Sequence, residues 1–185
     1  MYLGLDLGTS SLKALLIDDN QQILGSASAP LTVERLHPGW SEQDPDSWIS
    51  ATRVALAELA KTHAGDLAKV RGLGLSGHMH GATTIDRDGK VIRPCILWND
   101  TRSYKQAAVL DPQFRRVTGN IVFPGFTAPK LKWMAANEPD AFARVAKVLL
   151  PKDYLRLWLT GEAISEMSDS AGTSWLDVGK RAWDD

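Results

Sequence analysis

The chain has 185 residues, which is long enough for one well-buried core and therefore for a single domain. Its apolar fraction of 44%, charged fraction of 23% and formal net charge of −1 are ordinary for a soluble globular protein and argue against nucleic-acid or membrane partners. The single cysteine, Cys95, excludes an internal disulfide, and the N-terminus lacks a signal-peptide pattern, so we expect a cytoplasmic protein.

The chain opens with two apolar runs, one up to Asp6 and one through Ile17, on either side of a Gly-Thr-Ser-Ser turn. This pattern predicts two β-strands joined by a tight turn. Asp6 can hold a divalent cation, and the turn offers backbone N–H groups, hydroxyls and an ammonium to an anion. The residues concerned are Gly8, Thr9, Ser10, Ser11 and Lys13. Phosphate and metal binding is one interpretation, and an ordinary hairpin with a polar turn is the other.

The next elements predict an α/β fold with a mixed sheet and flanking helices. Residues 23–31 form the third strand of an antiparallel meander. Asp44 as N-cap and Pro45 at the first helical position start a helix that extends to about residue 62, and residues 70–75 return to a strand.

Residues 72–77 match the dinucleotide-binding pattern GxGxxG. That motif should follow a strand and open a helix, whereas these glycines lie inside the predicted strand. We therefore reject a nicotinamide or flavin site and expect the glycines to allow close backbone approach at the strand end.

Two histidines, His78 and His80, flank Met79 in a glycine-bounded stretch. In extended chain the two imidazoles lie on the same face. Three interpretations are open: a zinc chelate, which normally takes three protein ligands; two hydrogen-bonded histidines in a bend; and sugar recognition, because a neutral imidazole offers one donor and one acceptor.

Residues 91–97 predict a strand that ends in a polar cluster formed by Trp98, Asn99, Asp100 and Arg102. Such a cluster at a strand end suits a binding crevice, in which the indole forms an apolar wall and the polar groups contact hydroxyls. A helix start with Asp100 as N-cap and a solvated Arg102 explains the same residues and is compatible with the first interpretation.

The second half of the chain is predicted to be largely helical. We expect helices over residues 101–117, from Pro129 onward, at 138–140 and over 151–160, the last closed by Gly161 in the position after the helix. A short buried strand is expected at residues 147–150.

Several motifs in this order resemble those of the FGGY carbohydrate kinases, which belong to the actin-like ATPase superfamily. The motifs are Asp-Leu-Gly-Thr-Ser-Ser-Leu-Lys at 6–13, Met-His-Gly at 79–81, Trp-Asn-Asp-x-Arg at 98–102, the signature helix with Lys130 and Trp133, and Ser-Asp-x-x-Gly-Thr at 168–173. The Met-His pair and the run Leu-Leu-Pro-Lys-Asp-Tyr-Leu at 149–155 are most similar to the bacterial xylulose kinases.

The resemblance implies an actin-like (ribonuclease H-like) α/β domain that uses ATP and Mg²⁺. The implied reaction is transfer of the γ-phosphoryl group of ATP to D-xylulose, giving D-xylulose 5-phosphate. Asp6 would be the catalytic, metal-coordinating carboxylate, and the turn from Gly8 to Lys13 would bind the ATP phosphates. The sugar would contact Met79, His80, Trp98, Asn99, Asp100 and Arg102. Lys130 and Trp133 lie on a helix whose spacing is that of a packing helix, so we expect them to be structural.

The resemblance also implies a second actin-like domain that binds most of the adenosine and supplies the general-base Asp. We therefore expect residues 1–185 to be an incomplete N-terminal domain that is inactive alone and whose exposed apolar surface favours a homodimer. The alternatives are another FGGY kinase such as a ribulokinase, a non-catalytic sugar-binding remnant, and a ribonuclease H-like nuclease. The nuclease requires several acids that converge on two metals, and only Asp6 sits at a convincing strand end.

Overall fold

The computed structural model describes residues 1–184, which divide into two compact units. Unit 1 contains Met1–Val33 and Asp46–His78, and unit 2 contains Glu34–Pro45 and the described residues from Met79 onward. Within the described residues, none of the helices combines the length and apolar character needed to cross a membrane.

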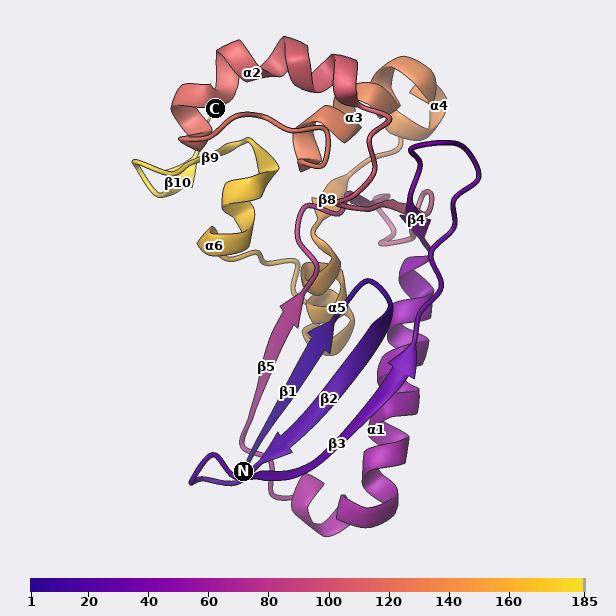
Figure 1. Cartoon of the computed structure of the whole chain (residues 1–185), viewed down its shortest axis with the longest axis vertical. Coiled ribbons are helices and arrows are strands. Elements are labelled where there is room, and N and C mark those ends of the chain that lie inside the picture. Colours follow the sequence, from indigo (N-terminus) through magenta and orange to yellow (C-terminus); the bar gives the residue numbers. More distant parts are fainter. Residues whose placement is uncertain (185) are drawn as a thin grey trace. The chain divides into compact units, whose positions relative to one another are not determined.

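Unit 1 is built on a four-stranded mixed sheet with the order β3-β2-β1-β5 (Figure 1). The strands β1 (Tyr2–Leu7), β2 (Ser11–Ile17) and β3 (Ile23–Pro30) form the predicted antiparallel meander. The fourth strand, β5 (Gly72–Gly77), pairs with β1 in parallel. The glycines of the rejected GxGxxG match therefore lie inside a strand, as predicted.

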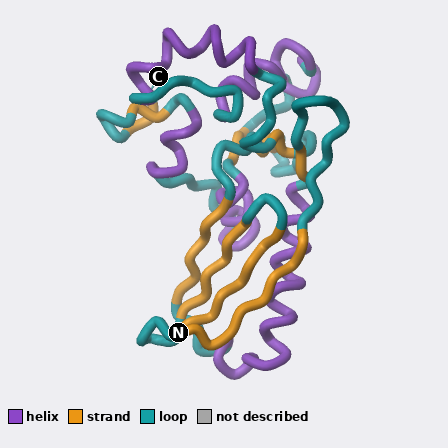
Figure 2. The backbone as a smooth tube through the Cα atoms, in the orientation of Figure 1, coloured by secondary structure: helices purple, strands orange, loops and turns teal. Residues whose placement is uncertain are grey.

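One face of this sheet is buried because apolar residues alternate along β1 and β2; these are Leu3, Leu5, Leu7, Leu12, Ala14 and Leu16. Helix α1 (Pro45–Leu67) lies along this face (Figure 2). The register pairs Leu16 with Gly25, and a Cβ added at Gly25 would meet Leu59 and His63 of α1. The helix kinks at His63, whose φ of −126° and ψ of 25° are not helical, so its regular part ends where the sequence predicts.

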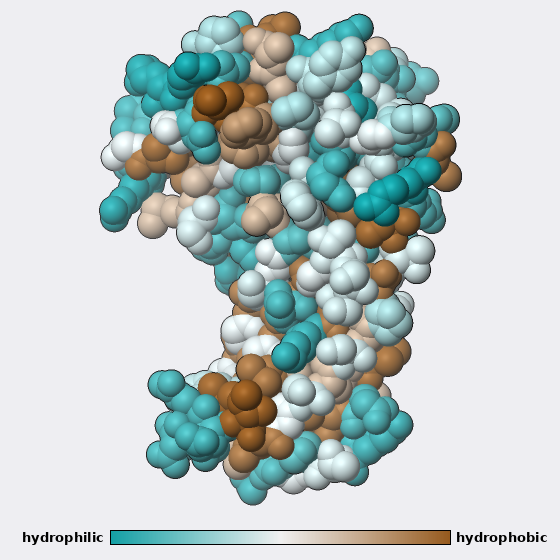
Figure 3. Space-filling model, viewed as in Figure 1, coloured by the Kyte–Doolittle hydropathy of each residue, from teal (hydrophilic) through white to brown (hydrophobic). Residues whose placement is uncertain are grey.

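The opposite face of the sheet carries polar side chains between apolar ones. Tyr2, Asp6 and Lys13 are exposed on it, and Figure 3 shows hydrophobic patches among hydrophilic residues along this face. Asp6 and Lys13 are therefore accessible, within unit 1, to small polar ligands.

Unit 2 contains three small antiparallel pairs of strands and a set of helices (Figure 2). The strand pairs are β4 (Glu42–Gln43) with β7 (Cys95–Ile96), β6 (Thr83–Ile85) with β8 (Lys147–Leu149), and β9 (Leu176–Asp177) with β10 (Ala182–Trp183). The helices are α2 (Tyr104–Thr118), α3 (Thr127–Asn137), α4 (Pro139–Phe142), α5 (Pro151–Thr160), α6 (Met167–Ser170) and a 3₁₀ turn at Ala171–Thr173. A hydrophobic cluster joins α2 to the start of α3 through Ala107, Leu110, Val122 and Phe126.

Two predictions for unit 2 are corrected by the structure. The expected strand at residues 91–97 is reduced to β7, and Pro94 has no N–H to donate to a longer ladder. Helix α2 begins after Ser103, so Asp100 is not its N-cap.

Candidate functional site

The first candidate site is the β1–β2 hairpin of unit 1. Asp6 and Lys13 are paired across the strands, so their exposed side chains project from the same face. An open hollow of about 430 Å³ lies beside them. It is lined by Gly4, Leu5, Asp6, Lys13, Leu15, Gly74, Leu75 and Ser76. A carboxylate and an ammonium thus stand together at the edge of an accessible cavity.

The turn of this hairpin is held by main-chain hydrogen bonds. Gly8 N donates to Ser11 O at 3.0 Å, and Leu31 N donates to Ser10 O at 2.8 Å. Ser10 is exposed, and Thr9 and Ser11 are partly exposed. Hydroxyls, a cation and a carboxylate at the end of rigid strands can bind an anion together with a hydrated divalent cation.

The second candidate site is the turn at Met79 and His80 in unit 2. Met79 is 47% exposed. His80 has a φ of +63°, and Gly81 N donates to Met79 O at 2.8 Å. This is a γ-turn of the positive-φ form, which is rare and strained. Because such strain costs about 1–3 kcal/mol and gathers at functional sites, it marks His80 as a residue whose orientation matters.

The imidazole of His80 is partly buried and packs against other residues of unit 2. Its ring centroid lies 4.7 Å from that of Phe126, and a Cβ added at Gly172 would overlap with the His80 ring. Burial, assisted by the charge of Lys130, lowers the pKa of His80 from 6.5 to about 4. The ring is therefore neutral at pH 7 and offers one donor and one acceptor. Its Nδ1 is buried without a hydrogen-bond partner among the described residues.

Two side chains of α3 hold the main chain of His80. Thr127 Oγ1 and Lys130 Nζ donate to His80 O at 3.1 Å and 2.7 Å. Lys130 Nζ also donates to Gly125 O at 2.7 Å, and both α3 side chains are completely buried. Helical spacing identified Lys130 as a packing residue but carried no signal for its contact with a carbonyl 50 positions earlier.

Trp98 and Asn99 follow β7. The Trp98 side chain is 42% exposed, and its carbonyl lies so close to Gly125 that a Cβ there would overlap with it. Asn99 borders a hollow of about 410 Å³ whose other lining residues are 35–41. Its Oδ1 is buried without a hydrogen-bond partner in the described part of the chain. Trp98 therefore presents surface to a small ligand, and Asn99 lies at the border of a hollow.

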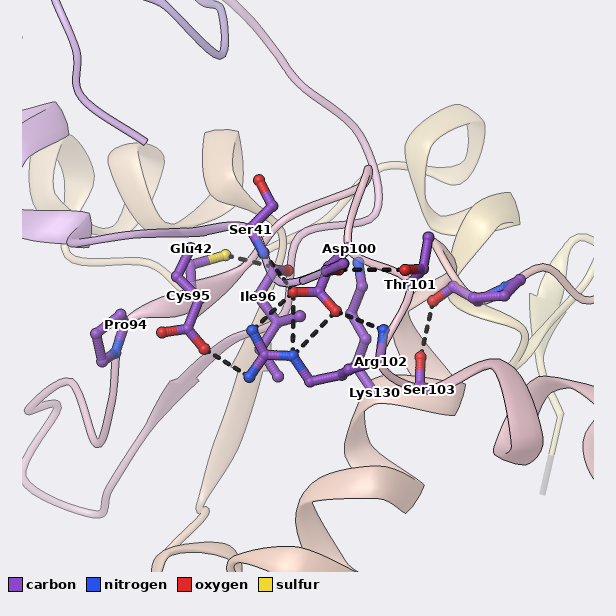
Figure 4. Close-up of polar contacts among 12 residues, drawn as sticks. Ser41, Glu42, Pro94, Cys95, Ile96, Asp100, Thr101, Arg102, Ser103 and Lys130 are labelled. Atoms are coloured by element: carbon purple, nitrogen blue, oxygen red, sulfur yellow. Dashed lines mark hydrogen bonds and ion pairs between the residues drawn. The ribbon is translucent and has the colours of Figure 1, made fainter. Parts of the chain in front are cut away.

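Asp100 and Arg102 are buried and paired with each other (Figure 4). Arg102 Nε donates to Asp100 Oδ1 at 2.9 Å and Nη2 donates to Oδ2 at 2.7 Å, while Ser41 N donates to Oδ2 at 2.6 Å. The sequence interpretation gave both residues direct sugar contacts. In the structure Asp100 is 0% exposed and Arg102 8% exposed, and these hydrogen bonds go to protein groups.

Glu42 extends this pair into a buried ionic network. Its carboxylate lies 2.6 Å from Arg102 Nη1 and also pairs with Arg93. Arg93 in turn pairs with Glu138 at 2.8 Å. Two indole rings lie over the Arg102 guanidinium, with centroids 3.6 Å and 5.0 Å from its Cζ: those of Trp40 and Trp133. The network fixes the segment that carries Trp98 and Asn99.

His78 lies in unit 1, where it is buried with its ring centroid 5.5 Å from that of Trp48. Across residues 1–184, no group of three or more His, Cys, Asp or Glu side chains is placed to hold a metal ion. Within the described residues there is therefore no set of ligands for the zinc site that His78 and His80 suggested. There is likewise none for the metal ions that a nuclease would need.

Comparison with known proteins relates these features to one family. The model of the FGGY family of carbohydrate kinases, N-terminal domain, matches residues 1–185. A xylulose kinase from Escherichia coli (strain K12) is 51% identical over 188 residues, which is 100% of this chain and 38% of that protein. The chain thus spans well under half the length of its curated relatives.

Solved structures give the same result. A structure described as a xyloylose kinase from Brucella ovis is 66% identical, with a TM-score of 0.97 over 98% of this chain and 39% of that one. The xylulose kinase from Rhodospirillum rubrum is 32% identical, with a TM-score of 0.91 over 96% and 38% of the two chains. The α/β actin-like fold with a mixed sheet, expected from the sequence, is confirmed by these matches. The chain therefore belongs to the FGGY family of carbohydrate kinases, and it matches the N-terminal domain of that family.

Proposed function

We propose that the full-length protein containing this chain uses ATP to phosphorylate D-xylulose to D-xylulose 5-phosphate. The observation that supports this most strongly is the 51% identity to the E. coli xylulose kinase along the whole chain. Because the match covers 38% of that protein, the activity is proposed for the full-length product and not for this chain alone.

The hairpin of unit 1 is proposed to hold the phosphates of ATP and Mg²⁺. An exposed carboxylate beside an exposed ammonium and several hydroxyls fits a hydrated cation and an anion. Asp6 would be the catalytic carboxylate and coordinate Mg²⁺; the phosphate-binding residues would be Gly8, Thr9, Ser10, Ser11 and Lys13. When bound, Mg²⁺ neutralises charge on the transferring phosphoryl group.

Unit 2 is proposed to bind the sugar through Met79, His80, Trp98 and Asn99. The neutral imidazole of His80 matches a hydroxyl as both donor and acceptor, and the exposed indole of Trp98 suits a sugar's C–H face. Asp100 and Arg102 are buried in an ionic network, so we assign them the role of holding the Trp98–Asn99 segment in place.

The remaining parts of the proposal concern the whole protein. Residues 1–185 would form the N-terminal domain, and a second actin-like domain outside this chain would bind the adenosine and supply the general-base Asp. The chain alone is then expected to be inactive. We further propose a cytoplasmic homodimer without nucleic-acid or membrane partners.

A coupled ADP-release assay on the full-length gene product tests the substrate. D-xylulose, D-ribulose, glycerol and other polyols are offered with ATP and Mg²⁺ at equal concentrations. We expect D-xylulose to have the highest kcat/KM. If ADP is released with another sugar but not with D-xylulose, the assignment of D-xylulose is wrong and the protein is a kinase of that other sugar.

Asp6→Asn tests the phosphate site. Loss of the carboxylate charge should reduce kcat by about 100-fold or more, because the Mg²⁺ that would neutralise charge on the transferring phosphoryl group would be held less tightly. Calorimetry should find the D-xylulose affinity nearly unchanged, since the sugar is assigned to unit 2. Asp88→Asn, at an exposed turn, is the matched control and should retain full activity. Full activity in Asp6→Asn would remove this carboxylate from the mechanism.

A further inference from the structure

We propose that Lys130 is a positioning residue: it holds the strained turn that aims the His80 imidazole and joins that turn to the segment carrying Trp98. This inference rests on the proposed function for its link to sugar binding, but the contact between Lys130 and the His80 turn can be tested separately. Lys130 itself need not touch the sugar.

The geometry of the Lys130 amine supports this role. Its Nζ donates at 2.7 Å to His80 O and at 2.7 Å to Gly125 O, and its side chain is completely buried. Lysine is almost never fully buried unless its charge is paired, yet these two acceptors are main-chain carbonyls. An apolar side chain would fill the same space without desolvating an amine. The lysine is therefore explained by the two carbonyls that it holds.

The first carbonyl belongs to the strained residue itself. His80 has a φ of +63° within a γ-turn, a conformation that persists only when its surroundings enforce it. Lys130 and Thr127 both donate to His80 O. Two donors on one carbonyl oppose rotation of the His80 peptide group, and so fix the direction in which the ring leaves the main chain.

The second carbonyl connects Lys130 to the other proposed sugar contact. Gly125 lies against the carbonyl of Trp98 so closely that a Cβ at position 125 would overlap with it. Because Lys130 binds the His80 turn and the Gly125 loop through one nitrogen, it sets the spacing between the segments that present His80 and Trp98.

The arrangement does not require a charged lysine. Burial lowers the pKa of Lys130 from 10.5 to about 7. A neutral amine still has two N–H donors, which equals the number of carbonyls that it serves. The turn is therefore held in both protonation states.

The test uses Lys130→Met in the full-length protein, because methionine keeps the length and apolar stem but has no donor. Lys132→Met, on the exposed side of the same helix, is the matched control. We expect Lys130→Met to raise the KM for D-xylulose about tenfold or more while the KM for ATP stays within about twofold. Thr127→Val removes only the second donor and should act in the same direction with a smaller effect.

A double-mutant cycle separates positioning from general stability. If Lys130 acts mainly through His80, Lys130→Met should cause a clearly smaller loss in the His80→Ala background than in the wild type, and what remains would come from the Trp98 segment. Additive losses, or equal increases in both KM values, would show a purely structural lysine and overturn the proposal. An unchanged sugar KM in both Lys130→Met and Thr127→Val would also overturn it.

The imidazole resonances of His80, assigned by their loss in His80→Ala, provide a readout that needs no substrate. Lys130→Met or Thr127→Val should shift them, and Lys132→Met should not. If D-xylulose proves not to be a substrate, this shift still supports the positioning role and only the proposed function fails. Unshifted resonances in both variants would overturn the positioning role whatever the substrate.

Discussion

At the scale of single residues, the orientation of His80 is determined from two sides. Its main chain is held at a positive φ by Thr127 and Lys130, while its ring packs against Phe126 and Gly172. The segment at residues 168–173, whose motif resembles that of the sugar kinases, therefore contacts His80, the residue that we propose binds the sugar. Gly172 is needed because any side chain at this position would occupy the space of the imidazole.

Gly172→Ala in the full-length protein should therefore displace the His80 ring. We expect the KM for D-xylulose to rise about tenfold or more and the KM for ATP to stay nearly constant, as a small misplacement of a binding group is costly. Steady-state kinetics with each substrate varied in turn measure both values. Gly65→Ala, where an added Cβ meets no atom within 4 Å, is the control. An unchanged sugar KM in Gly172→Ala would mean that the ring position does not matter for binding.

At the scale of elements, the buried ionic network ties together parts of unit 2 that have little regular structure. Glu42 lies on β4, Arg93 and Arg102 lie on either side of β7, and Glu138 stands between α3 and α4. The strands concerned are only two residues long, so their ladders contribute few hydrogen bonds. These segments are instead held together by charge-assisted hydrogen bonds and by the indole rings over Arg102.

Arg102→Met in the 185-residue chain should be strongly destabilising, because it leaves Glu42 and Asp100 buried without their shared cation. We expect a loss of about 3–5 kcal/mol in the free energy of unfolding. Arg102→Lys should recover only part of this, since lysine lacks the planar fork. Urea denaturation followed by tryptophan fluorescence measures both, with Arg35→Met at an exposed position as control. A loss no larger than that of the control would contradict this account.

Elements with local signals are predicted well from the sequence. Helix α5 runs over Pro151–Thr160 as expected, because Pro151 suits a first turn and Gly161 adopts the left-handed C-cap with a φ of 76°. No helix is predicted at the family motif of residues 168–173, yet α6 runs over Met167–Ser170, and its N-cap Glu166 accepts from Ser168 N and Asp169 N. Glutamate is not a preferred N-cap, so the sequence lacked the usual signal for this helix.

The candidate site is predictable only in part. Motif positions select Asp6 and His80 as candidates, but they give no sign that Asp100 and Arg102 are buried. Their partners Ser41 and Glu42 lie about 60 residues earlier, and no spacing rule reports such a contact. The contact between Lys130 and His80 O was missed for the same reason, because it depends on how α3 meets a distant turn.

At the scale of the whole molecule, the buried amine and thiol of unit 2 make stability depend on pH. Burial lowers the pKa of Lys130 to about 7 and raises the pKa of Cys95 from 9.0 to about 11. The unfolded chain therefore binds a proton at Lys130 between pH 7 and 10.5 that the folded chain lacks. Between pH 9 and 11 it loses a proton at Cys95 that the folded chain keeps.

The free energy of unfolding should accordingly rise from pH 7 to 9, with Lys130 contributing at most about 1.4 kcal/mol per pH unit. Above pH 9 the ionisation of Cys95 in the unfolded chain opposes this gain, so the slope should flatten. Urea midpoints at intervals of half a pH unit measure the profile. Lys130→Met should remove the rise and Lys132→Met should keep it; the same slope in both variants would rule out Lys130 as its source.

Unit 1 consists of two stretches of chain, and the segment between them, Glu34–Pro45, belongs to unit 2. A ribosome therefore releases Glu42 long before it has made Arg93 and Arg102, the cations that bind it. All of unit 1 has been synthesised once residue 78 has emerged. The segment 34–45 remains without Arg102, a partner of Glu42, until about two dozen more residues have been made. The order of translation thus separates the assembly of the chain into an early β-sheet step and a later electrostatic one.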